Sequence, residues 1–368
     1  MADIIQRSEE QATFALRALY SKYGYLAFKM SKFEEYELYI RNKDFLVSDR
    51  IITFNDTNGK LLALKPDVTL SIIKQGEDQR GVKQKVYYNE NVYRVSESTG
   101  HYKEIMQSGI ECLGDIDLYD KFEVLSLAAQ SLGLVSKNFV LEISHMGIVS
   151  AVLDEIDADQ GFRRQAIHFI SEKNTHDLAR LCAEQGVSEQ LTAKLTSLVT
   201  IYGKRSTVLA QLSNICTTPA AAEALAELTQ ISALLDNMAE SDRVIFDFSV
   251  VNDMSYYNGL VFKGFIDGIC DGVLAGGQYD KMMHKMGRRA GAIGFALYLD
   301  LLEQLRDTSV GFDVDVLVLY DSTTSPDALY KTVNKLISEG KRVSAQRAIP
   351  EKLRYRQCLD VREEAAKC

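Results

Sequence analysis

The chain has 368 residues, of which 46% are hydrophobic, and a formal net charge of −9 at pH 7. This length predicts two or three domains, with enough apolar residues for a sizeable core. The acidic balance argues against broad electrostatic capture of nucleic acid, which requires a basic face. Charges run through the amphipathic residues 1–25, so we expect neither a signal peptide nor a transmembrane segment there, no membrane partner and a cytoplasmic location.

The six cysteines are scattered along the chain without CxxC or Cys/His ligand spacing. Such a distribution favours reduced thiols over a disulfide framework or a zinc site. We therefore expect no metal ion and no cofactor.

The first part of the chain alternates helical and strand patterns. A helix is expected over residues 5–22, and a β-hairpin is expected around the turn signal at residues 55–59. A second helix should begin after Pro66, because proline ends the preceding strand. Residues 84–95 and 102–114 are typical of two antiparallel strands.

A long helical stretch interrupts the later strands. The patterns predict, in order, a helix, a buried strand, a wholly helical stretch and two further strands at residues 117–134, 138–145, 147–241, 243–251 and 256–266. A helix is expected after the glycine-rich turn at residues 291–294, and a βαβ unit closes the chain.

Three groups of residues could carry chemistry. Asp67 and Thr69 follow a predicted strand end, where a carboxylate and a hydroxyl can point into a pocket; helix capping after Pro66 is the alternative. Gln107 and Glu111 lie four apart on one strand and so face the same side. If buried they need partners, such as an ammonium or an imidazole, whereas a solvated strand face would need none.

The third group surrounds two later segments. Tyr256 and Tyr257 should point to opposite faces of a strand, so that only one of them enters a given pocket. Gly276 and Gly277 allow a ligand to approach the backbone closely, although a tight turn between a strand and a helix would also use them.

Together these segments resemble the motifs of histidyl-tRNA synthetases, which are class II aminoacyl-tRNA synthetases. LALKPDVT resembles the family's LALRPEGT, and YRVSESTGHYKEIMQSGIE resembles its motif 2. SYYNGLVF resembles LDYYxxxVFE, AGGQYD resembles AGGRYD, and AGAIGFALYLDLL resembles motif 3. The motifs occur in the family's order, and the similarity runs from about Gly24 to Leu305.

The resemblance implies a histidine-binding pocket. In the family, the matching positions hold the amino acid, with carboxylates toward the ammonium and polar groups toward the imidazole. The residues implied here are Asp67, Thr69, Gln107, Glu111, Tyr257 and Tyr279, with Tyr256 adjacent to the pocket.

The ATP side departs from the family pattern. Arg94 matches the arginine of motif 2 and would remain on the phosphate side, but Ser96 replaces the acidic residue expected at the adenine. Asn252 and Leu301 occupy the places of the two other phosphate-binding arginines, and Asp253 replaces a glycine. Because such arginines stabilise a transferring group, their loss implies that the chain is not an active ligase.

The segment after Phe312 is shorter than the family's anticodon-binding domain and has no marked excess of basic residues, so no tRNA binding is expected. This combination resembles the regulatory subunits of ATP phosphoribosyltransferase, a paralogous group. It implies a non-catalytic subunit that assembles with the short-form catalytic subunit at the first step of histidine biosynthesis and helps confer feedback inhibition by histidine. It also implies a self-dimer through the motif 1 region, about Gly24 to Tyr39.

Several alternatives stay open. The chain could be a divergent synthetase or another amino-acid-activating enzyme that uses Arg94, or a stand-alone amino-acid sensor that docks an unrelated protein. The effector histidine could also bind at the interface with the catalytic subunit, with the synthetase-type pocket kept for packing.

The resemblance implies an α+β fold. It would combine the antiparallel sheet and flanking helices of a class II aminoacyl-tRNA synthetase with a helical insertion and a truncated C-terminal α/β unit. The expected domains are residues 1–146 with 242–310 for the synthetase-like part, 147–241 for the insertion and 311–368 for the C-terminal unit.

Overall fold

The computed structural model describes residues 8–43, 46, 50–76, 81–95, 100–251, 256–305 and 312–362. The chain divides into two compact units, one over Arg7–Leu305 and one that holds Arg306–Cys368. Within the described ranges, no helix is long and apolar enough to span a membrane. The sequence-based domain boundaries differ from this division in treating residues 147–241 as a separate insertion, and they stay a prediction.

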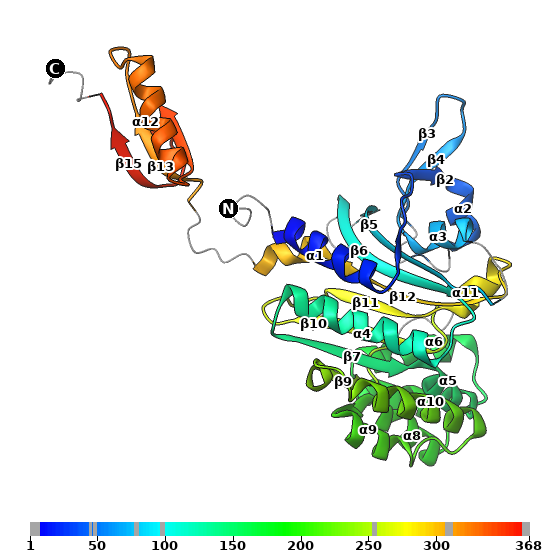
Figure 1. The fold of residues 1–368 in the computed structure, drawn as a ribbon. Helices are drawn as coiled ribbons and strands as arrows, with labels where there is room; N and C mark the ends of the chain where they lie inside the picture. The colour runs from blue at the N-terminus through cyan, green and yellow to red at the C-terminus, as the bar shows by residue number, and fades with distance from the viewer. Residues whose placement is uncertain are drawn as a thin grey trace. The chain divides into compact units, whose positions relative to one another are not determined.

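A nine-stranded sheet forms the centre of the larger unit (Figure 1). Its order is β1-β5-β6-β12-β11-β10-β7-β9-β8, and all neighbours are antiparallel except the pairs β1 with β5 and β7 with β9. The strands are β1 (Leu26–Ala27), β5 (Gln84–Val95), β6 (Tyr102–Gly114), β7 (Phe139–His145), β8 (Tyr202–Gly203), β9 (Val244–Asp247), β10 (Leu260–Ile266), β11 (Leu274–Gln278) and β12 (Gly291–Tyr298).

One face of this sheet is covered by two helices, α1 (Ser8–Lys22) and α4 (Leu118–Val135), which contact each other. Apolar side chains such as Ile110, Phe295 and Leu297 alternate toward this face and are buried in the largest core cluster. The α4 helix begins with a capping box, in which Asp117 and Asp120 each accept from the other's backbone amide.

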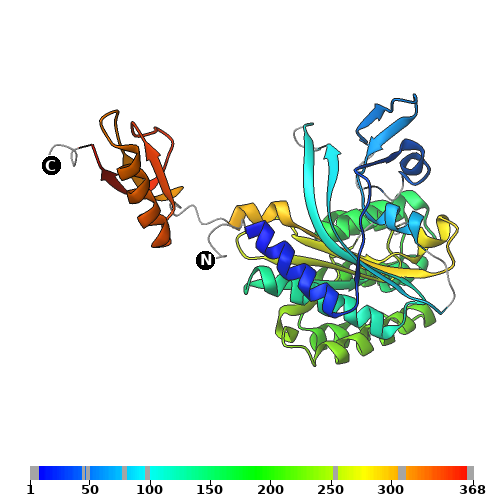
Figure 2. The ribbon, with the colours of Figure 1, turned by 45° about the horizontal axis from the view of Figure 1, so that its top comes forward.

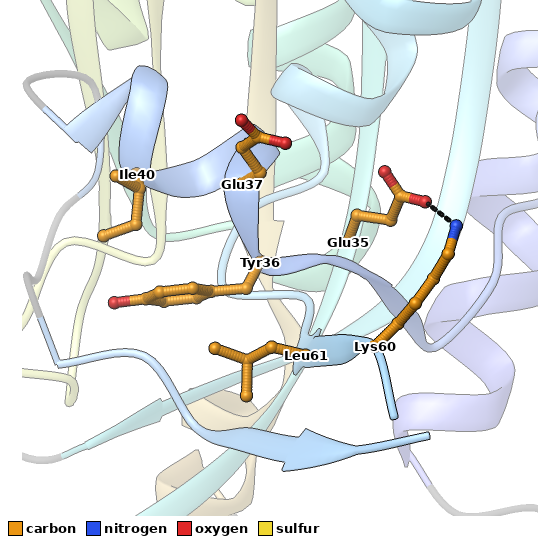
Figure 3. Close-up of a pocket in the computed structure, with 6 residues that line it drawn as sticks. All are labelled: Glu35, Tyr36, Glu37, Ile40, Lys60 and Leu61. Atoms are coloured by element: carbon orange, nitrogen blue, oxygen red, sulfur yellow. Dashed lines mark hydrogen bonds and ion pairs between the residues drawn. The ribbon is translucent and has the colours of Figure 1, made fainter. Parts of the chain in front are cut away.

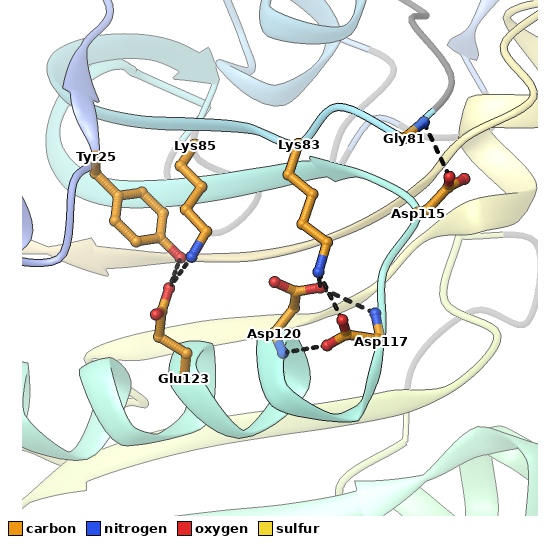
Figure 4. A network of polar contacts seen from close by, with 8 residues as sticks. All are labelled: Tyr25, Gly81, Lys83, Lys85, Asp115, Asp117, Asp120 and Glu123. Carbon is orange, nitrogen blue, oxygen red and sulfur yellow. Dashed lines mark hydrogen bonds and ion pairs between the residues drawn. The ribbon is translucent and has the colours of Figure 1, made fainter.

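Charged side chains fasten the N-terminal segment to α4 (Figure 4). Lys85 of β5 donates to Glu123 of α4 at 2.6 Å, and the buried Tyr25 hydroxyl donates to the same carboxylate at 3.2 Å. Lys83 forms ion pairs with Asp117 and Asp120. This network fixes the chain just before β1, at the edge of the sheet.

The opposite face of the sheet contains a row of residues with two glycines. One row across five strands contains, in register, Val86, Glu111, Gly294, Gly277 and Val261. Because glycines occupy two places in this row, large side chains can lie flat against the backbone there.

A small three-stranded sheet stands apart from the large one, as both views show (Figures 1 and 2). It consists of β2 (Phe33–Glu35), β3 (Thr53–Asn55) and β4 (Leu61–Leu64), with α2 (Tyr36–Arg41) after β2. The predicted hairpin around residues 55–59 and the predicted helix after Pro66, α3 (Thr69–Gln75), are both confirmed.

Residues between β7 and β9 gather at one end of the large sheet (Figure 1). They form α5 (Met146–Asp154), α6 (Gln160–Ser171), α7 (Thr175–Glu184), α8 (Glu189–Thr200), α9 (Arg205–Leu212) and α10 (Pro219–Leu235). The expectation of a wholly helical stretch was wrong at one point. The two-residue strand β8 pairs with β9, which extends the sheet.

The prediction of a helix after the glycines at 291–294 was also wrong. Residues Gly291–Tyr298 are a central strand, and only the following Leu299–Leu305 segment, η4, is a 3₁₀ helix. A strand buried on both faces reads as a continuous apolar run, which periodicity cannot distinguish from a buried helix.

The C-terminal unit contains the predicted βαβ arrangement. Its elements are β13 (Val314–Leu319), α12 (Pro326–Ser338), β14 (Val343–Gln346) and β15 (Tyr355–Asp360). The strands are parallel, in the order β14-β13-β15, and Val316 and Val318 form a small core beside α12.

Candidate functional site

Glu111 of β6 is the centre of a buried polar cluster. The residue is 2% exposed, and its carboxylate accepts two hydrogen bonds from other parts of the chain. Thr69 Oγ1, at the start of α3, donates to Oε1 at 2.9 Å, and the Tyr279 hydroxyl donates to Oε2 at 2.5 Å. The structure therefore brings together three of the predicted residues.

The glycine row explains how this carboxylate fits on the sheet. Gly294 lies directly opposite Glu111, and a Cβ atom at Gly294 would be 1.8 Å from Glu111 Oε2. Any side chain at that position would therefore displace the carboxylate.

Asp67 lies in the turn that precedes α3 and is half-buried. Its Oδ1 accepts the backbone amide of Leu70 at 2.9 Å, so the capping contact that the sequence left open is present. Burial raises the pKa of Asp67, while the positive charge of Arg94 opposes this shift. Arg94 itself donates from Nε to the carbonyl oxygen of Pro66 at 2.9 Å.

The electrostatics of the cluster favour a ligand with a positive charge. The pKa of Glu111 is raised to about 8, mainly by burial and also by the nearby Asp67 carboxylate, while the hydrogen bonds from Tyr279 and Thr69 oppose the rise. No lysine or arginine of the described ranges forms an ion pair with either carboxylate. A cationic group beside Glu111 would stabilise its ionised form.

Tyrosine rings form one wall of the cluster. The ring centroids of Tyr256 and Tyr257 are 4.4 Å apart, and those of Tyr256 and Tyr279 are 6.1 Å apart. The expectation that Tyr256 and Tyr257 point to opposite faces of a strand was wrong, because β10 begins only at Leu260. The two tyrosines lie in the turn before it, where strand alternation does not apply.

The glycine pair also differs from expectation. Gly276 and Gly277 lie inside β11 and not in a turn between a strand and a helix. A Cβ atom at Gly277 would be 2.6 Å from the Tyr257 ring, so the space beside this glycine is already occupied by a tyrosine. Gly276 faces the other side of the sheet, against Phe295.

Gln107 is buried on the same face of β6 as Glu111, four residues along the strand or about 13 Å away. Among the described residues its side chain has no hydrogen-bond partner, and Tyr298 is its neighbour on β12. It lies opposite the last residue of β12 and is not in direct contact with the Glu111 carboxylate.

The sequence reasoning missed Tyr88 of β5. This buried residue pairs with Gly109, where a Cβ atom would be 2.5 Å from the Tyr88 hydroxyl oxygen, and the charge of Glu111 adds to the burial that raises its pKa. The available signal was Gly109 itself, between Gln107 and Glu111, since a strand glycine marks a close approach.

Comparison with known proteins agrees with this geometry. A sequence model of the family described as histidyl-tRNA synthetase matches residues 5–302. The chain belongs to the histidyl-tRNA synthetase family. The class II synthetase-like fold expected from the motifs is thereby confirmed.

Similar proteins carry a more specific description. An ATP phosphoribosyltransferase regulatory subunit of Oceanobacillus iheyensis is 29% identical over 315 residues, which are 83% of this chain and 77% of the relative. A Bacillus halodurans structure described as an ATP phosphoribosyltransferase regulatory subunit/histidyl-tRNA synthetase superposes with a TM-score of 0.77 at 23% identity, covering 96% of this chain and 93% of that one. These matches confirm the predicted resemblance to the regulatory subunits of ATP phosphoribosyltransferase.

A chain in the structure of an ATP phosphoribosyl transferase complex from Thermotoga maritima shares the fold with a TM-score of 0.62 at 19% identity. The match covers 78% of this chain and 96% of that chain.

Proposed function

We propose that the chain is a non-catalytic regulatory subunit of ATP phosphoribosyltransferase that binds histidine at the Glu111 cluster and makes the enzyme sensitive to feedback inhibition. The observation that carries this proposal is the Glu111 carboxyl, which is buried, held by Thr69 and Tyr279, and without a cationic partner among the described residues. The names of the similar proteins support ATP phosphoribosyltransferase as the enzyme that is regulated.

Histidine fits the chemistry of the cluster. Its α-ammonium can pair with Glu111 or Asp67, and its imidazole can exchange hydrogen bonds with tyrosine hydroxyls or the Gln107 amide. Regulation requires only that histidine bind one assembly state better than another, with a coupling of about 1–3 kcal/mol.

The partner that we propose is the short-form catalytic subunit of ATP phosphoribosyltransferase. The Thermotoga maritima structure contains a chain of this fold within an ATP phosphoribosyl transferase complex, which supports such an assembly. We propose no tRNA partner, because the segment after Phe312 has no marked excess of the basic residues that tRNA binding requires.

We also propose that the chain forms a dimer through residues 24–39. Leu26 is 72% exposed in the edge strand β1, and Phe33 is 47% exposed in β2. Beside this segment, a pocket of about 420 Å³ opens between α2 and β4 (Figure 3). Its apolar side is formed by Tyr36, Ile40 and Leu61, so a second copy would bury apolar surface there.

The absence of ligase activity is part of the proposal. Leu301 stands where the family has an arginine, and it is half-buried against the large core in η4. The other such position, Asn252, lies outside the described residues, as do Asp253 and Ser96. Arg94 is already bound to the Pro66 carbonyl oxygen.

Calorimetry tests the histidine site directly. Histidine should bind the unaltered chain, and the double variant Asp67→Ala, Glu111→Ala should lose the binding. Equal binding by both proteins would place histidine elsewhere, for example at the interface with the catalytic subunit.

A further inference from the structure

Asp280 connects the tyrosine-bearing turn to two central strands. Its Oδ2 accepts hydrogen bonds from Asn258 Nδ2 at 3.0 Å and from Gln278 Nε2 at 2.6 Å. Its Oδ1 accepts the backbone amide of Ala292 at 2.9 Å. In return, the backbone amide of Asp280 donates to Asn258 Oδ1 at 2.9 Å.

This reciprocal pair fixes two tyrosines of the candidate site at once. Asn258 directly follows Tyr257, and Asp280 directly follows Tyr279, whose hydroxyl donates to Glu111. The two segments already meet through the backbone, because the Asn258 amide donates to the Gln278 carbonyl oxygen at 3.1 Å. Through the Asn258 and Asp280 side chains, the position of one ring constrains the other.

The surrounding glycines show that the fold reserves space for this arrangement. A Cβ atom at Gly291 would be 2.6 Å from Asp280 Oδ1, and one at Gly259 would be 2.1 Å from Gln278 Oε1. Asp280 and Gln278 therefore depend on two separate positions without side chains. Gln278 Oε1 is buried without a hydrogen-bond partner, so the amide is held by its nitrogen alone.

We propose that Asn258 and Asp280 act as positioning residues, a latch that holds Tyr257 and Tyr279 in the arrangement that receives the ligand. This inference rests on the proposed function, because histidine is the ligand for which the latch prepares the site.

The turn that carries Tyr257 and Asn258 also borders a second cavity. Tyr257 and Asn258 also line a cavity of about 370 Å³ whose opposite wall comes from α5 and α10. The latch thus connects the candidate site with the helices between β7 and β9.

The variant Asn258→Ala tests the latch. We expect histidine affinity to fall about ten- to a hundredfold, the usual effect of losing a buried hydrogen bond to a charged group. We also expect a changed near-ultraviolet circular dichroism spectrum before histidine is added. This spectrum reports mainly on tyrosine because the chain has no tryptophan.

A matched control lies at the start of α7, where Asn174 is the N-cap residue. Asn174 and Asp177 form the same reciprocal pair. Asn174 Nδ2 donates to Asp177 Oδ2 at 2.7 Å, and the backbone amide of Asp177 donates to Asn174 Oδ1 at 3.0 Å. Asn174→Ala should leave histidine affinity and the tyrosine spectrum unchanged, even if it lowers stability.

Rescue separates positioning from general stability. Asn258→Asp alone places two carboxylates in contact, and their repulsion should weaken histidine binding more than Asn258→Ala does. Adding Asp280→Asn restores an amide opposite a carboxylate, and it gives Gln278 Oε1 a donor after a flip of that amide. The exchanged pair should recover most of the lost affinity.

Unchanged affinity and an unchanged spectrum in Asn258→Ala would overturn the latch, as would an exchanged pair no better than Asn258→Asp. If the unaltered chain binds no histidine, the proposed ligand fails. The spectra of Asn258→Ala and of the exchanged pair then decide the latch on their own.

Discussion

The Tyr279 hydroxyl donates a 2.5 Å hydrogen bond to Glu111 Oε2, which joins residues 168 positions apart in the sequence. This contact places a buried carboxyl at the meeting point of β6 and the segment that follows β11. Since burial disfavours the charged form, the carboxyl is a destabilising group in the absence of a ligand. A ligand with a cationic group beside the carboxylate would stabilise its ionised form and offset this cost.

Replacing Glu111 by glutamine should therefore abolish histidine binding, because the amide keeps the size of the side chain but cannot pair with an ammonium. Calorimetry should show a loss of at least about a hundredfold. Glu142→Gln is a suitable control, since burial also raises the pKa of that carboxyl, which lies on β7 outside the cluster. Full binding by Glu111→Gln would contradict the assignment.

The same variant should change the pH dependence of stability. The pKa of Glu111 is about 8 in the folded state and 4.5 ordinarily. Between these two pH values the side chain is therefore protonated in the folded state and ionised in the unfolded state. The contribution of Glu111 to the free energy of unfolding is therefore fully present below pH 4.5. It falls by about 1.4 kcal/mol per pH unit as the pH rises from there and is lost once the pH has passed through 8. Glu111→Gln should become progressively more stable than the unaltered chain over this range in urea unfolding. Parallel curves would show that the carboxyl is not buried as described.

Gly277→Ala should disturb the tyrosine wall. The added Cβ would be 2.6 Å from the Tyr257 ring and 2.7 Å from the carbonyl oxygen of Leu260, so the backbone must move. We expect a destabilisation of about 1–3 kcal/mol in urea unfolding together with weaker histidine binding. Gly272→Ala is the control, because its Cβ would meet nothing closer than 3.6 Å. Equal stability of the two variants would show that Tyr257 does not occupy the space beside Gly277.

Leu26→Glu should convert a dimer to a monomer in light scattering after size-exclusion chromatography. The side chain is 72% exposed in the edge strand β1, where a second copy would bury it and a charge would oppose association. Tyr330→Glu, at an exposed position of α12, should leave the dimer intact. A dimer that survives Leu26→Glu would place the interface outside residues 24–39.

The sequence predicted the main elements of the site because short motifs describe local structure well. Asp67 and Thr69 lie at the strand-to-helix turn that Pro66 indicated, and Gln107 and Glu111 share one face of β6 as their spacing required. Strand alternation gave the wrong arrangement for Tyr256 and Tyr257, because they lie in a turn before β10, where Asn258 contacts Asp280. Tyr88 was missed for a related reason, since only the β5–β6 register brings it to the Glu111 face.

Strand β12 shows the corresponding limit for the fold. Its alternating small and large residues fit either a buried helix or a strand inserted between β6 and β11, and only its two neighbours decide between them. The glycines in it were expected to form a turn. In the structure, Gly294 instead provides the space that the Glu111 carboxylate occupies.

Histidine-dependent ATP–pyrophosphate exchange distinguishes the regulatory proposal from a divergent synthetase. Because we propose that Leu301 takes the place of the family's phosphate-binding arginine, we expect no exchange above background. The variant Leu301→Arg should not by itself restore activity, because the same proposal gives Asn252 the place of a second arginine. Clear turnover by the unaltered chain would show that it is an amino-acid-activating enzyme.

The most direct test of the whole account is the activity of a short-form ATP phosphoribosyltransferase catalytic subunit, titrated with histidine in the presence and absence of this chain. The account predicts that the chain co-purifies with the catalytic subunit, that histidine inhibits the complex, and that inhibition disappears when Glu111→Gln replaces the unaltered chain. Identical histidine inhibition with and without the chain, or no association between the two proteins, would contradict it.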